Sequence, residues 1–118
     1  MPELEFRQVD VFTDRVLAGN ALAVFLDAGE LSSEAMQALA AETNLSETTF
    51  VLLPTEPEAD YRIRIFTPNR ELPFAGHPSV GTAHVLLEEG RLGELGEGLL
   101  VKQEVAIGVL PIEIKPTV

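Results

Sequence analysis

Two short polar segments adjoin apolar stretches of the chain and hold side chains that could transfer protons. The first is Gly76-His77-Pro78-Ser79, directly before an apolar run that predicts a buried helix. The first N–H groups of a helix have no partner within it, and the helix dipole is positive there, so such a start can bind a carboxylate or a phosphate. An imidazole at His77 could donate or relay a proton near neutral pH. The alternative is an ordinary helix start, with His77 capping it or facing solvent.

The second segment is Ser46-Glu47-Thr48-Thr49, which is predicted to connect a helix to a strand. Apolar residues 50–53 follow it, so the Glu47 carboxyl group could be partly buried. A carboxyl group held in this way could remove a proton as a base and return it as an acid. The alternative is a solvated loop glutamate, which is the commoner state because glutamate side chains are mostly exposed.

Other motifs that could bind a metal ion or a nucleotide do not fit. His77 and His84 are separated on the predicted helix by a rise of ~10.5 Å, which is too far for one metal ion. Residues 76–82 have the glycine spacing of a phosphate loop but lack its lysine, and residues 93–98 have the wrong spacing for a dinucleotide loop. The chain has no cysteine, which excludes disulfides, zinc–thiolate sites and thiol nucleophiles within it. We therefore predict no metal site.

The composition bounds the class of protein. A chain of 118 residues fits one compact domain. Its 19 acidic and 8 basic residues give a net charge of -11, which repels phosphate backbones and anionic lipid. The basic residues are scattered, the N-terminus has no secretory signal, and no apolar stretch approaches the ~20 residues that span a bilayer. These features predict a cytoplasmic protein that binds neither nucleic acid nor membrane.

Hydrophobic patterning predicts a mixture of six or seven strands with two helices. One helix begins after Ser32 or Ser33, ends near Asn44 and has a single apolar face. The other, residues 78–88, is apolar on almost every side and is therefore expected to be central and surrounded. A turn is expected at residues 13–15. The predicted strands are residues 4–12, 21–25, 50–53, 61–67, 99–105 and 109–114. The strand 61–67 alternates and is predicted to be half-exposed, with Phe66 on the same face as Arg62 and Arg64.

Three blocks of sequence carry a resemblance through their order and spacing across residues 10–82. They are DVFTD with GNALAVF (10–14 and 19–25), ETNLSETTFV (42–51), and RIFTP with ELPFAGHP (64–68 and 71–78). This arrangement resembles the N-terminal half of the phenazine-biosynthesis PhzF-like family. The resemblance implies an α+β fold of the diaminopimelate epimerase type. Each half of that fold is a barrel-like, curled mixed sheet wrapped around a central helix, here with one outer helix.

The resemblance also implies an isomerase that shifts a proton on a small carboxylate substrate without a cofactor or a metal. In the family pattern, the glutamate at position 47 is the general acid/base and the histidine at position 77 assists it. Glu47 and His77 are therefore the expected catalytic residues. Four neighbouring residues are expected to bind the substrate: Ser46, Gly76, Pro78 and Ser79.

Family members are more than twice as long as this chain. Residues 1–118 are thus expected to form the N-terminal PhzF-like domain, and the second family domain, with its aspartate and Thr-Gly-Ser block, is absent from this chain. We expect this half alone to be inactive or nearly so. Its site would be completed by the missing half, a partner chain, or self-association into a homo-oligomer such as a dimer. The alternative is a non-catalytic binding or assembly module with the same half fold.

Overall fold

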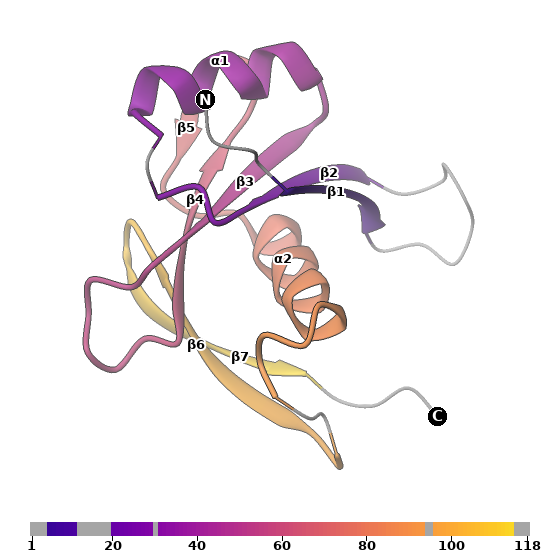
Figure 1. The fold of residues 1–118 in the computed structure, drawn as a ribbon, viewed down its shortest axis with the longest axis vertical. Coiled ribbons are helices and arrows are strands. Elements are labelled where there is room, and N and C mark those ends of the chain that lie inside the picture. The colour runs from indigo at the N-terminus through magenta and orange to yellow at the C-terminus, as the bar shows by residue number, and fades with distance from the viewer. Residues whose placement is uncertain (1–4, 12–19, 30, 94–95, 115–118) are drawn as a thin grey trace.

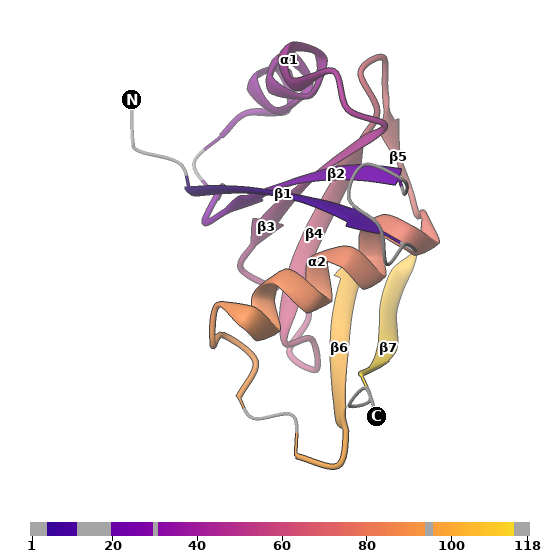
Figure 2. The same ribbon diagram turned by 90° about the vertical axis from the view of Figure 1, so that its right-hand side faces the viewer.

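A computed structural model describes residues 5–11, 20–29, 31–93 and 96–114. A strongly curled, seven-stranded sheet surrounds one helix, α2, while the other helix, α1, lies on the outside of the sheet (Figures 1 and 2). The α+β fold predicted from the sequence is confirmed. The elements are β1 (Glu5–Val11), β2 (Asn20–Leu26), α1 (Ser33–Thr43), β3 (Glu47–Leu52), β4 (Tyr61–Phe66), β5 (Glu71–Leu72), α2 (Gly76–Glu88), β6 (Leu99–Val105) and β7 (Gly108–Ile114).

The sheet is mixed, with the strand order β1-β2-β3-β4-β6-β7 and with β5 paired to β4. The pairs β1/β2, β3/β4, β4/β5 and β6/β7 are antiparallel. The pairs β2/β3 and β4/β6 are parallel, and each is joined through a helix, as a parallel crossover requires. Among the described residues β1 and β7 are the two edges of this path, so the curled sheet is not closed.

Strand β2 is buried on both faces, which explains its continuous apolar sequence. Because side chains alternate along a strand, Leu22 and Val24 of β2 join the cluster that packs around α2. Ala23 and Phe25 of the same strand join the cluster beneath α1. The helix α2 is buried along most of its length, although His84 is exposed. The prediction of a surrounded helix is confirmed.

The outer helix has the ends that its sequence predicts. The Ser32 side chain accepts a hydrogen bond from the Ala35 N–H at 3.1 Å and so caps the first turn. Asn44 adopts the left-handed conformation, with φ of 54°, and its N–H donates to the Ala40 carbonyl. These two caps fix where α1 stops, and therefore where the chain turns into β3.

Four local predictions differ from the structure. β3 begins at Glu47 instead of Phe50, because its first residues pair with β2 in the register Leu22↔Glu47. Glu47 is thus a strand residue and not a loop residue. α2 begins at Gly76, so Pro78 is its third residue and not its first. Phe66 is buried beneath α1 rather than on a half-exposed face, and the short strand β5 was not predicted. The turn predicted at residues 13–15 lies outside the described residues.

The connection between β3 and β4 is held by one carboxylate from β6. Glu104 accepts hydrogen bonds from the N–H groups of Thr55 and Glu56, at 2.7 and 2.9 Å, and from the Thr55 hydroxyl. The Arg62 guanidinium lies 3.7 Å from the same carboxylate. Burial raises the pKa of Glu104, but the hydrogen bonds from Thr55 and Glu56 and the charge of Arg62 outweigh it, so that this pKa lies below its ordinary value of 4.5.

This carboxylate should make stability depend on pH. A folded-state pKa below the unfolded value means that the stabilisation is complete above about pH 4.5 and is lost as the pH falls through the folded-state pKa. We expect Glu104→Gln to lower the free energy of unfolding by about 1–3 kcal/mol at pH 7, since a charged acceptor of several hydrogen bonds is lost. Urea denaturation measures the free energy of unfolding at pH 7 and at acidic pH. The decrease in this free energy between the two pH values should be smaller in the variant than in the wild type. An equal loss in both would contradict this role.

Candidate active site

The structure brings Glu47 and His77 into direct contact although they are 30 residues apart in sequence. Glu47 is the first residue of β3 and His77 is the second residue of α2. The His77 Nε2 atom lies 2.8 Å from Glu47 Oε2, which is a hydrogen-bond distance. The side chains are only 13 % (Glu47) and 18 % (His77) exposed. A carboxyl group and an imidazole in this geometry can exchange a proton with each other or with a molecule at the open side.

The first turn of α2 adds a feature suited to anions. Its N-cap residue, Ala75, has no side chain that could accept a hydrogen bond, and Pro78 carries no N–H. The leading N–H groups of the helix therefore belong to Gly76 and His77, where the helix dipole is positive. A carboxylate bound there would lie directly beside the Glu47–His77 pair.

The predicted substrate-binding residues divide into two groups. Ser46 and Gly76 are exposed and adjoin Glu47 and His77 in the chain. Pro78 and Ser79 are buried inside the curled sheet, and the Ser79 side chain is only 1 % exposed. Ser46 and Gly76 are thus accessible to solvent, whereas Ser79 belongs to the interior. The binding roles of all four residues remain predictions.

A buried polar group beneath the start of α2 was missed in the sequence. Gln103 of β6 is fully buried, and its amide nitrogen donates to the Tyr61 Oη atom at 2.8 Å and to the Ser79 carbonyl at 3.1 Å. Burial raises the pKa of Tyr61 to about 12, and the hydrogen bond from Gln103 opposes this only in part. The signal was available: in a strand, Gln103 falls on the same face as Val101 and Val105, which are apolar.

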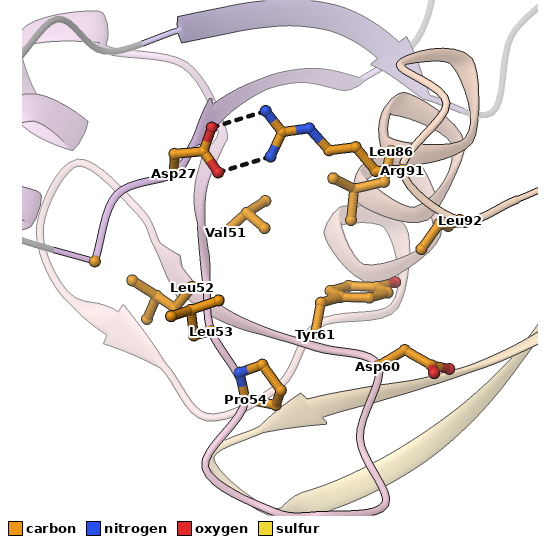
Figure 3. A pocket seen from close by; sticks show the side chains of 11 residues that line it. Asp27, Val51, Leu52, Leu53, Pro54, Asp60, Tyr61, Leu86, Arg91 and Leu92 are labelled. Atoms are coloured by element: carbon orange, nitrogen blue, oxygen red, sulfur yellow. Dashed lines mark hydrogen bonds and ion pairs between the residues drawn. The ribbon is translucent and has the colours of Figure 1, made fainter.

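A cavity in the described structure lies near the other end of α2. It has a volume of about 440 Å³, and the Tyr61 ring lies in its wall (Figure 3). Its other apolar lining side chains are Val51, Leu52, Leu53, Pro54, Leu86 and Leu92. At its rim, Arg91 forms two 2.7 Å hydrogen bonds with Asp27, and these lower the pKa of Asp27. Neither Glu47 nor His77 lines this cavity. The Glu47–His77 pair therefore lies outside this cavity.

In the parts of the chain that the structure describes, no three His, Asp or Glu side chains converge in a way that could hold a metal ion. No helix among the described residues is both long and apolar enough to cross a bilayer. The cytoplasmic location stays a prediction.

Comparison with known proteins places the chain in a family. The family model of the phenazine biosynthesis-like proteins, PhzC-PhzF, matches residues 9–117. The chain belongs to this family. The resemblance noted in the sequence is thereby confirmed.

Curated proteins similar to this PhzF-family chain include several isomerases. It is 58 % identical over 78 residues to a trans-2,3-dihydro-3-hydroxyanthranilate isomerase of Pseudomonas aeruginosa, a match covering 66 % of this chain and 28 % of that protein. It is 54 % identical over 90 residues to antisense-enhancing sequence 1 of Schizosaccharomyces pombe, covering 76 % of this chain and 30 % of that protein. The PhzF-family chain thus spans about a third of the length of these relatives.

Solved structures agree with this placement. The PhzF-family protein of Bacillus anthracis superimposes with a TM-score of 0.87 at 37 % identity, over 99 % of this chain and 38 % of that one. A hydroxyproline epimerase from Agrobacterium vitis superimposes with a TM-score of 0.79 at 14 % identity, over 97 % of this chain and 38 % of that one. At that identity the second likeness concerns the fold alone.

Proposed function

We propose that this chain is the N-terminal half of an isomerase that moves a proton within a small substrate bearing a carboxylate. Glu47 is the general acid/base and His77 is its partner. The observation that carries the proposal is the 2.8 Å contact between these side chains beside the uncapped start of α2. The names of the related isomerases support the same class of reaction.

The proposed reaction needs only one carboxyl group. The substrate carboxylate binds at the N-terminal turn of α2, with Ser46 and Gly76 at the open side. The ionised Glu47 takes a proton from a substrate carbon through Oε1, while the His77 Nε2–H donates to Oε2 and holds the carboxylate in place. The electron pair left on the substrate shifts, and Glu47 returns the proton to a different carbon. Atoms and electrons balance within the substrate, so no cofactor, metal or redox partner is required.

The cleft must be completed from outside this chain. Glu47 and His77 are partly open to solvent, and water around a carboxylate weakens its interaction with a substrate proton. Because the chain spans only 28–38 % of the isomerase and the PhzF-family structure described above, we propose that a second domain covers this site. Self-association is the other route, in which a second copy of the chain would cover the open side.

A joined protein tests this proposal. The chain would replace the matching N-terminal part of the Pseudomonas aeruginosa isomerase, and both the joined protein and the chain alone would be given trans-2,3-dihydro-3-hydroxyanthranilate. We expect turnover by the joined protein and little or none by the chain alone. Sedimentation of the chain alone distinguishes completion of the site by a second domain from completion by self-association. If the chain alone turns over substrate only at concentrations where it forms a dimer, a second copy completes the site. A folded joined protein without turnover would instead favour a non-catalytic module.

A further inference from the structure

Two threonines inside the fold form a hydrogen-bonded chain that the proposed reaction does not use. Thr49 of β3 and Thr82 of α2 are fully buried, and their hydroxyl oxygens lie 2.7 Å apart. The Thr82 hydroxyl also donates to the Pro78 carbonyl at 2.7 Å. A hydroxyl group has one proton to donate, so Thr49 must be the donor to Thr82. The order is therefore Thr49 to Thr82 to the Pro78 carbonyl.

This chain of hydroxyl groups joins the two elements that carry the candidate catalytic side chains. Thr49 is two residues beyond Glu47 and therefore on the same face of β3. Pro78 follows His77 directly in the first turn of α2. The link thus joins β3, two residues beyond Glu47, to α2 at Thr82, whose hydroxyl group reaches back to the carbonyl of the residue after His77. A second link reaches the next carbonyl of the same turn, that of Ser79, from Gln103.

A purely apolar contact would not fix the distance between β3 and α2 as narrowly as this hydrogen bond does. Apolar packing is non-directional, whereas a hydrogen bond fixes both a distance and an angle. Threonine at both positions also has a cost if the pairing fails, because a buried hydroxyl group without a hydrogen-bond partner destabilises the folded state. Thr82 donates to a carbonyl of its own helix, so it is the Thr49 hydroxyl that finds its acceptor through the alignment of β3 with α2. That alignment places Glu47 and His77 in contact.

We propose that Thr49 and Thr82 are positioning residues that set the alignment of Glu47 with His77. The importance of this alignment for catalysis rests on the proposed function. The effect of the two threonines on the alignment does not depend on that function. The two threonines do not touch the substrate, and they act through the backbone of β3 and of the first turn of α2. A spectroscopic readout of the pair therefore tests this inference without any assay of turnover.

The test uses the double variant Thr49→Val with Thr82→Val in the 118-residue chain. Valine keeps the shape of threonine, and removing both partners of a buried hydrogen bond together can leave stability nearly unchanged. NMR of the His77 ring would follow the Nε2 proton and the ring nitrogens. We expect the double variant to melt close to the wild type but to exchange the Nε2 proton about tenfold faster, as the loss of one hydrogen bond implies.

Matched variants make the result specific. The single variant Thr82→Ser retains the hydroxyl group and should give the same His77 ring signals as the wild type. Thr48→Val is the control on the same strand, because Thr48 is equally buried but its hydroxyl pairs with Thr43 of α1. It should leave the ring signals unchanged. Wild-type signals in the double variant would overturn the proposal, and so would equal disturbance by Thr48→Val. Failure of the double variant to fold would also overturn it, since the hydroxyl groups would then serve the whole core.

Discussion

Glu47→Gln should lower the rate of proton transfer by about 10²–10⁴-fold in the joined protein. Glutamine has nearly the same size as glutamate, and its amide oxygen can still accept a hydrogen bond from His77. It cannot take up a proton at neutral pH, so the base is removed while the contact with α2 is retained. The decisive measurement is turnover of trans-2,3-dihydro-3-hydroxyanthranilate together with deuterium incorporation from D₂O. Both should fall together, because one carboxyl group is proposed to remove and return the proton.

A matched control separates this effect from a change in charge. Glu42→Gln alters charge by the same amount at an exposed position of α1 and should leave turnover unchanged. Circular dichroism should give the same spectrum for both variants and the wild type. If Glu47→Gln retained turnover, the assignment of the acid/base would be wrong even though the fold and family would stand.

Phe50→Ala should produce the largest loss of stability among single substitutions in the hydrophobic cluster beneath α1. Phe50 is fully buried beneath α1, stacks on Phe25 with ring centroids 5.1 Å apart, and meets Phe66 edge-on at 5.4 Å. Removing such a ring typically costs about 3–5 kcal/mol, because the transfer free energy is lost and a cavity remains. Domains of this size are stable by only about 5–15 kcal/mol, so we expect the variant to be partly unfolded at 37 °C. Urea denaturation monitored by circular dichroism measures the change.

Leu53→Ala is the corresponding control. Leu53 follows β3 directly but is 86 % exposed, so its truncation should change the free energy of unfolding by no more than about 0.5 kcal/mol. A loss below about 1 kcal/mol for Phe50→Ala would show that the three aromatic rings do not form a closely packed core.

Much of the architecture was predictable from local chemistry. The cap at Ser32 and the left-handed end at Asn44 define α1, and both are visible as residue types at fixed positions. The apolar residues on nearly all sides of α2 predict that it is surrounded. Gly108 in the hairpin between β6 and β7 is similarly local, since its positive φ of 138° favours glycine.

The features that the sequence could not reveal depend on which strands become neighbours. Glu47 was expected in a loop, and it belongs to β3 only because β2 pairs with its first residues. Phe66 was expected on a half-exposed face, and it is buried because α1 covers that face of β4. The link between Thr49 and Thr82 likewise needs the packing of α2 against β3. No pattern of period two or 3.6 contains this information.

The two parallel pairings also determine when the site can exist during folding. The hairpins β1/β2, β3/β4 and β6/β7 connect strands that follow one another in sequence, and such local units form quickly. Joining β2 to β3 and β4 to β6 closes longer loops across a helix, which costs more chain entropy and slows assembly. Glu47 lies on the first of these joins. A partly folded chain can therefore contain every hairpin and still lack the contact between Glu47 and His77, which also needs α2 to pack against β3.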